Sequence, residues 1–243
     1  MIKAAIIQAR TGSARLPGKV LKEINGKPMI EWLINRVKLS SNIDKVVLAI
    51  PDNSEDDVLF GIAKRLNIVC VRGSQQDVLS RYLKAAKETS ADVIVRITGD
   101  CPLIDSKIID EMLDYFEKEK CDYLINDVEY GGHPRGFDVD VFSVKILKKI
   151  GKLAISDYNK EHITTFMLEN PGMFKIEYYE VPEGLYRPNY RLCVDEESDL
   201  LLVKKIFDYF KPREDFTARE IISYLDNNPK TAEINKNVRQ ENN

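Results

Sequence analysis

The chain has 243 residues, of which 44% are hydrophobic and 31% charged, so it can bury a large core and lacks the composition of a disordered protein. A formal net charge of −3 disfavours an electrostatic nucleic-acid binder, and no apolar stretch reaches membrane-spanning length. The amino terminus shows no signal-peptide pattern, and four scattered cysteines are typical of free thiols. We therefore expect a cytoplasmic protein that binds neither nucleic acid nor membranes.

Strands alternate with amphipathic helices through the first half of the chain. This pattern predicts an α/β fold with a mostly parallel central sheet and helices on both faces. The predicted strands are 2–7, 45–50, 68–71 and 92–97, and the predicted helices are 28–39, 53–66, 75–88 and 106–119.

Beyond residue 119 the alternation is less regular. Strands are predicted at 123–126, 137–144, 174–181 and 190–194, and helices at 155–169, at 200–209 and after a capping Thr217. We expect a single domain over residues 1–228, with a mixed α/β part at about 123–190. Residues 229–243 read as a polar, frayed C-terminal tail.

The loop after the first predicted strand reads QARTGSARLPGK over residues 8–19. Gly12 and Gly18 allow close backbone approach, and Arg10, Arg15 and Lys19 supply positive charge. Because open α/β sheets bind ligands at the carboxyl ends of their strands, the loop predicts a polyphosphate site.

Two other interpretations of this loop compete. A Walker loop would have four residues between its glycines and a Ser or Thr after the lysine, whereas this loop has five and Val20. A solvated basic turn is the structural alternative.

Two aspartates follow predicted strands and should lie at the same edge of the sheet. Asp100 follows strand 92–97 in the segment TGDCPLID, and Asp195 follows strand 190–194. Mg²⁺ takes one or two carboxylates together with phosphate oxygens and waters, so the pair suggests a Mg²⁺ site beside the loop. Alternatively, Asp100 is a turn residue and Asp195 a helix cap.

The segments QARTGSARLPGK, TGDCPLID and VDEESDL, in that order, resemble those of the cytidylyltransferases that make CMP-activated sugar acids. These include the CMP-Kdo and CMP-sialate synthetases, and the resemblance is closest to the spore-coat-polysaccharide type. It extends from residue 1 to about residue 210. It implies a Rossmann-like nucleotidyltransferase fold and Mg²⁺-dependent transfer of CMP from CTP to a sugar acid or phosphorylated small molecule, with release of pyrophosphate. We also expect a role in surface polysaccharide or glycoconjugate biosynthesis, and a homodimer.

The resemblance also implies which residues act. Arg10, Arg15, Lys19 and Asp100 would be catalytic, and Asp100 and Asp195 would bind Mg²⁺. The nucleotide would contact Gln8, Ala9, Arg10, Gly12, Ser13, Arg15, Lys19, Arg72, Asp77, Ser80 and Arg81.

The acceptor-binding candidates are Arg135, Asp138, Asp140, Glu161 and His162. Alternatively, the two aspartates lie on the solvent face of an alternating strand, and His162 is a core or surface histidine.

Other functions stay open from the sequence. A sugar-1-phosphate nucleotidylyltransferase that uses another NTP would share the loop and the carboxylates. A nucleotide-sugar-dependent glycosyltransferase would rely on a DxD pair, and the one such pair, Asp138-Val139-Asp140, lies on a strand away from the basic loop. A non-catalytic nucleotide-sensing or scaffold protein would bind CTP without releasing pyrophosphate.

Overall fold

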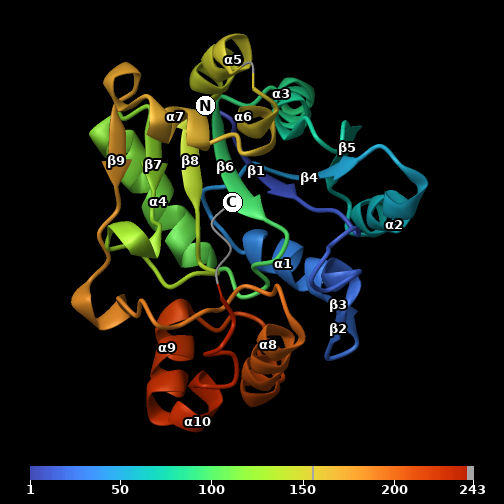
Figure 1. Cartoon of the computed structure of the whole chain (residues 1–243), viewed down its shortest axis with the longest axis vertical. Helices are drawn as coiled ribbons and strands as arrows, with labels where there is room; N and C mark the ends of the chain where they lie inside the picture. The colour runs from blue at the N-terminus through green and yellow to red at the C-terminus, as the bar shows by residue number, and fades with distance from the viewer. Residues whose placement is uncertain (155, 240–243) are drawn as a thin grey trace.

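The computed structural model describes residues 1–154 and 156–239, which form a seven-stranded sheet and a separate two-stranded hairpin. The strand order in the main sheet is β5-β4-β1-β6-β8-β7-β9 (Figure 1). Its strands are β1 (Lys3–Gln8), β4 (Lys45–Pro51), β5 (Val69–Gly73), β6 (Val93–Thr98), β7 (Tyr123–Ile125), β8 (Asp140–Ser143) and β9 (Ile176–Tyr178). The hairpin joins β2 (Glu23–Ile24) to β3 (Lys27–Pro28).

The first half of the sheet is parallel and the second half is mixed. β1 pairs in parallel with β4 and β6, and β4 with β5. β8 runs antiparallel to both β6 and β7, and β9 is parallel to β7. Because Gln8 is the register partner of Thr98, the segments that follow β1 and β6 leave the sheet side by side. This pairing places residues 9–19 next to Gly99 and Asp100.

Helices cover both faces of the sheet. They are α1 (Met29–Val37), α2 (Asp57–Arg65), α3 (Val78–Thr89), α4 (Ser106–Glu119), α5 (Val144–Leu153), α6 (Asp157–Glu161), α7 (Thr165–Glu169), α8 (Glu197–Phe210), α9 (Ala218–Asn227) and α10 (Pro229–Ala232). No helix within the described ranges is both long enough and apolar enough to traverse a bilayer.

Alternating residues of β1 belong to two separate hydrophobic cores. Ala5 and Ile7 pack in the core that includes α1, α2, α4, α8 and α9, whereas Ala4 and Ile6 pack in the core that includes α3 and α5. Successive side chains of a strand point to opposite faces, so both faces of the sheet are covered. The prediction of a mostly parallel α/β sheet between two helical layers is confirmed.

Several predicted elements differ in the structure. Strand 137–144 is shortened to β8, and the residues that follow form α5, where the Ser143 hydroxyl caps the helix by accepting from the amide of Ile146 at 3.3 Å. The predicted helix 155–169 is two short helices, α6 and α7, and its first residue lies outside the described residues. Residues 190–194 form only an isolated bridge, in which Arg191 pairs with Arg135.

The hairpin at β2 and β3 was not predicted, although the sequence carries a signal for it. Its turn is Asn25-Gly26, and both residues have positive φ, 48° and 79°. An Asn-Gly pair is the strongest short-range signal for a two-residue hairpin turn.

The predicted frayed tail is wrong for residues 229–239. α10 opens this segment, Ile234 packs against the larger core, and Asn235 is buried. Residues 240–243 of the predicted tail lie outside the described residues. Residues 229–239 therefore belong to the folded body.

Candidate active site

A cavity of about 380 Å³ opens at the carboxyl ends of β1 and β6. This volume is in the range of sites for small molecules. Its lining contains most of the residues predicted for the nucleotide and the metal: Gln8, Ala9, Arg10, Gly12, Ser13, Arg15, Lys19, Arg81, Asp100 and Asp195. The tertiary structure thus brings the basic loop over residues 8–19 and both aspartates to one place.

Backbone contacts hold the loop over this cavity. The amide of Gly18, which has a left-handed φ of 66°, donates to the carbonyl of Thr11 at 3.0 Å. The amide of Thr11 donates at 2.7 Å to the buried carboxylate of Asp56. At the end of β6, a Cβ on Gly99 would lie 2.9 Å from the carbonyl oxygen of Gln8, so only glycine fits without displacing backbone.

Lys19 bridges the two aspartates. Its Nζ donates to Asp100 Oδ2 at 3.0 Å, to Asp195 Oδ1 at 2.8 Å and to the carbonyl of Val194 at 2.9 Å. The sequence predicted that this loop cation binds phosphates, whereas in the structure its ammonium pairs with the carboxylates of Asp100 and Asp195.

Charge coupling favours the ionised forms of Lys19 and Asp100. Burial alone would lower the pKa of Lys19, but the charges of Asp100 and Asp195 outweigh it, so that pKa lies above its usual range. Burial would likewise raise the pKa of Asp100, yet the Lys19 charge and a Thr98 hydrogen bond bring it below its usual value.

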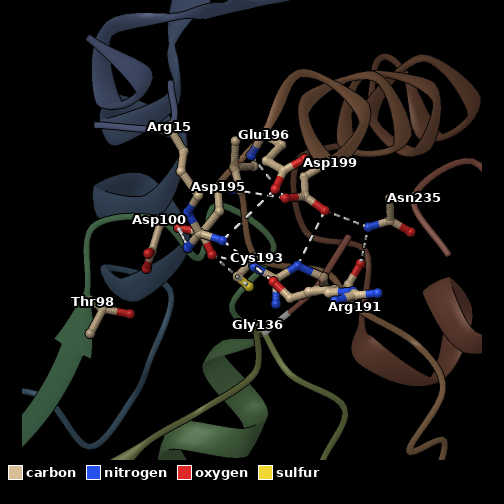
Figure 2. Close-up of polar contacts among 12 residues, drawn as sticks. Arg15, Thr98, Asp100, Gly136, Arg191, Cys193, Asp195, Glu196, Asp199 and Asn235 are labelled. Carbon is tan, nitrogen blue, oxygen red and sulfur yellow. Dashed lines mark hydrogen bonds and ion pairs between the residues drawn. The ribbon is translucent and has the colours of Figure 1, made fainter. Parts of the chain in front are cut away.

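Arginines hold the other side of Asp195. Figure 2 shows Arg15 reaching from the basic loop to this carboxylate, and its Nη2 lies 3.1 Å from Oδ1. Arg191 Nη2 forms an ion pair with Oδ2 of the same carboxylate. The Asp195 carboxylate therefore pairs with one arginine from the loop and one from the segment that precedes it.

The described residues include no group of three or more His, Cys, Asp or Glu side chains that could hold a metal ion. Asp100 and Asp195 nevertheless contact a single ammonium, so they can face one small cation. Such a donor set fits Mg²⁺, which completes its shell with phosphate oxygens and waters.

Two arginines at the cavity wall differ in their pairing. Arg81 is only 4% exposed, and its Nε and Nη1 have no hydrogen-bond partner among the described residues. Burial lowers the pKa of Arg81. Arg96 is ion-paired with Asp140. Sequence reasoning missed Arg96, although a charge inside the apolar run DVIVRI was a usable signal.

The other residues predicted for the nucleotide lie outside the lining of this cavity. The guanidinium of Arg72 is held by Asp57 and by the carbonyl of Asn53, in the segment that follows β4. Asp77 caps α3 by accepting from the amide of Ser80 at 2.8 Å. Arg72 lies within β5 and Asp77 follows it, and local ion pairing and capping use the polar atoms of both side chains.

Only two acceptor candidates, Glu161 and His162, line the cavity. Arg135 pairs with Glu129 at 3.1 Å. Asp140 is 7% exposed and bound to Arg96 and to the hydroxyl of Tyr123, so it is neither a solvent-face residue nor part of the lining.

Asp138 also lies outside the lining. Its Oδ2 accepts from the amide of Gly136 at 2.8 Å, while its Oδ1 is buried without a hydrogen-bond partner in the described part of the chain. Burial raises the pKa of Asp138 to about 7. The carboxyl group is therefore costly to ionise in the folded protein.

We expect Asp138→Asn to raise the melting temperature at pH 8 and to change it little at pH 4. The unfolded pKa is about 3.9, so the wild type loses stability as the pH rises from there to the folded value. The amide oxygen of Asn can still accept from Gly136. Thermal unfolding at both pH values checks this, with the exposed Asp208→Asn as control. An equal gain at both pH values would contradict it.

Comparisons with known proteins agree with this geometry. The cytidylyltransferase family model matches residues 4–220. The chain is 39% identical over 239 residues to an uncharacterized protein of Methanocaldococcus jannaschii, covering 97% of this chain and 95% of that protein. It is 32% identical over 234 residues to the spore coat polysaccharide biosynthesis protein SpsF of Bacillus subtilis, and the match covers 93% of this chain and 95% of that protein.

A solved structure of a cytidylyltransferase from Leptospira borgpetersenii serovar Hardjo-bovis is also similar to this fold. It matches with a TM-score of 0.91 and 33% identity, over 99% of both chains. The chain belongs to the cytidylyltransferase family, as its three sequence motifs predicted.

Proposed function

We propose that the protein transfers CMP from CTP to a sugar acid or a phosphorylated small molecule and releases pyrophosphate. The observation that carries this proposal is the cavity at the ends of β1 and β6, where a cationic loop meets two carboxylates that share one ammonium. A nucleoside triphosphate offers the negative charge that Arg10, Arg15 and Lys19 would bind.

The reaction forms one phosphorus–oxygen bond and breaks another. An acceptor oxygen attacks the α-phosphorus of CTP, the bond to the oxygen that bridges to the β-phosphorus breaks, and pyrophosphate leaves with that oxygen. A hydroxyl acceptor loses its proton to water, and a phosphate acceptor already carries an ionised oxygen. Because negative charge spreads over the phosphate oxygens, positioning and positive charge provide the catalysis.

Binding of the triphosphate exchanges partners within the cluster. Lys19 and Arg15 would turn from the carboxylates to the phosphates, and Asp100 and Asp195 would then be the residues that hold Mg²⁺. The bound Mg²⁺ would supply charge neutralisation at the phosphate oxygens. Arg81, whose guanidinium lacks hydrogen-bond partners at Nε and Nη1 within the described residues, offers a further donor for the nucleotide.

The acceptor is proposed to lie near Glu161 and His162, which come from α6 and its end and share the cavity with the loop. The Bacillus subtilis relative is a spore coat polysaccharide biosynthesis protein, which supports a product used in surface polysaccharide or glycoconjugate biosynthesis. A glycosyltransferase is disfavoured, because neither aspartate of the DxD pair, Asp138 and Asp140, lines this cavity.

A homodimer is also proposed. The edge strand β9 ends in Tyr178, whose exposed ring lies 4.5 Å from that of the exposed Tyr130. Aromatic residues are enriched where protein surfaces meet.

We expect sedimentation velocity to give a mass twice the 27.9 kDa of the chain. The double variant Tyr130→Ser, Tyr178→Ser should shift the measured mass toward that of the monomer. The exposed Tyr209→Ser serves as control, and a wild type that stays monomeric at micromolar concentration would refute the dimer.

The nucleotide and acceptor can be tested together by measuring pyrophosphate release. Each NTP is incubated with Mg²⁺ and a panel of sugar acids and phosphorylated small molecules, and we expect release only with CTP and an acceptor. Equal release with ATP, GTP or UTP would favour the sugar-1-phosphate nucleotidylyltransferase alternative. Stabilisation of the fold by CTP without release in any combination would favour a nucleotide-sensing protein.

Asp100→Asn and Asp195→Asn should each lower Mg²⁺-dependent turnover by roughly 100-fold or more, because each removes a charged ligand without changing side-chain volume. Residues that act as one unit lose function non-additively, so the double variant should be little worse than either single variant. Steady-state pyrophosphate release checks this, with Asp208→Asn as control. Near-normal turnover of Asp195→Asn at limiting Mg²⁺ would reduce Asp195 to a structural residue.

A further inference from the structure

Asp195 lies in an irregular segment that other parts of the chain hold in place. The amide of Val194 donates to the carbonyl of Asp100 at 2.8 Å, and the amide of Leu192 donates to that of Arg135 at 2.7 Å. A Cβ on Gly136, whose φ is 105°, would lie 2.4 Å from the carbonyl carbon of Leu192, so the backbones pack directly. These contacts fix the segment before Asp195.

The backbone at Asp195 itself is held by Asp199, in the first turn of α8. Asp199 Oδ2 accepts from the amides of Asp195 at 2.9 Å and Glu196 at 3.0 Å. This carboxylate is fully buried, and a buried charge is costly unless each oxygen is partnered. The conformation of the turn thus depends on the remaining partners of Asp199.

Those partners are Arg191 and Asn235. Arg191 Nε lies 3.3 Å from Asp199 Oδ1, and Nη2 of the same guanidinium pairs with the carboxylate of Asp195. Arg191 therefore links the buried aspartate to the proposed metal ligand. A shift of Arg191 would change the direction in which the Asp195 carboxylate points.

Asn235, in the C-terminal segment, binds both Arg191 and Asp199. Its Nδ2 donates to Asp199 Oδ1 at 2.7 Å and to the carbonyl of Arg191 at 2.9 Å, which uses both amide hydrogens. The side chain is 4% exposed, and the neighbouring Ile234 packs against the larger core. In Figure 2, Asn235 approaches the network from the side opposite to Arg15.

We propose that Asn235 is a positioning residue for Asp195, and that the segment 229–239 is thereby part of the active site. This inference rests on the proposed function, because it assigns the positioning to a carboxylate proposed to bind Mg²⁺. Asn235 holds the Arg191 backbone and the Asp199 carboxylate at a fixed separation. These two groups in turn hold the backbone and the carboxylate of Asp195.

The kinetic test is Asn235→Ala, with Asn227→Ala as the matched control. The amide of Asn227 donates to the carbonyl of Ser223 on α9, and no contact joins it to this network among the described residues. We expect Asn235→Ala to lower kcat at least roughly tenfold, with a smaller change in the KM for CTP and a higher Mg²⁺ concentration at half-maximal turnover. Asn227→Ala should behave as the wild type.

Amide hydrogen exchange by NMR gives a second readout that needs neither metal nor turnover. The amides of Asp195 and Glu196 should exchange roughly tenfold faster in Asn235→Ala, and Asn235→Ser, which retains one donor, should be intermediate. Exchange and kcat that match the wild type in Asn235→Ala would overturn the proposal. A lower melting temperature with a fully active folded fraction would also overturn it, because it would show a purely structural role.

The two proposals fail separately. If the wild type releases no pyrophosphate with any NTP and acceptor, the proposed function fails, and the exchange rates still decide whether Asn235 orders the Asp195 turn. If the wild type is active and Asn235→Ala retains its kcat, only the positioning role fails.

Discussion

The Lys19 ammonium between Asp100 and Asp195 is the interaction on which the site depends. Two carboxylates that contact the same ammonium repel each other, and the positive charge of Lys19 between them offsets this repulsion. Lys19 belongs to the basic loop after β1, Asp100 to the segment after β6 and Asp195 to the turn before α8. A single charge therefore joins three segments that are distant in sequence, and a ligand that competes for this charge can rearrange all three.

The cavity combines paired and unpaired positive charge. Arg15 and Arg96 are engaged by carboxylates, whereas Arg10 is exposed and Arg81 is buried with guanidinium nitrogens that lack hydrogen-bond partners within the described residues. A buried, incompletely satisfied guanidinium costs folding free energy unless a ligand satisfies it. This imbalance favours a ligand that carries several negative charges.

The two halves of the sheet have separate roles at the site. The parallel half brings the loop after β1 beside the end of β6, because parallel neighbours end at the same edge. The elements after the antiparallel β8 add Glu161 and His162 to the same cavity. The C-terminal helices complete it from outside the sheet, through Asp199 on α8 and Asn235 beyond α10. The hydrogen bonds around Asp195 therefore include side chains as far along the chain as Asn235.

The sequence by itself determined the parallel strands, the helical layers, the basic loop after β1 and the two aspartates that meet it, because periodicity and strand ends are local patterns. The Asn25-Gly26 hairpin and the charge of Arg96 within β6 were also readable there. Only the tertiary structure decided which partner each side chain takes: Lys19 binds carboxylates, Asp140 is buried against Arg96, and Asn235 holds Asp199. These choices depend on distances between residues that lie far apart in the chain, and no local pattern specifies such distances.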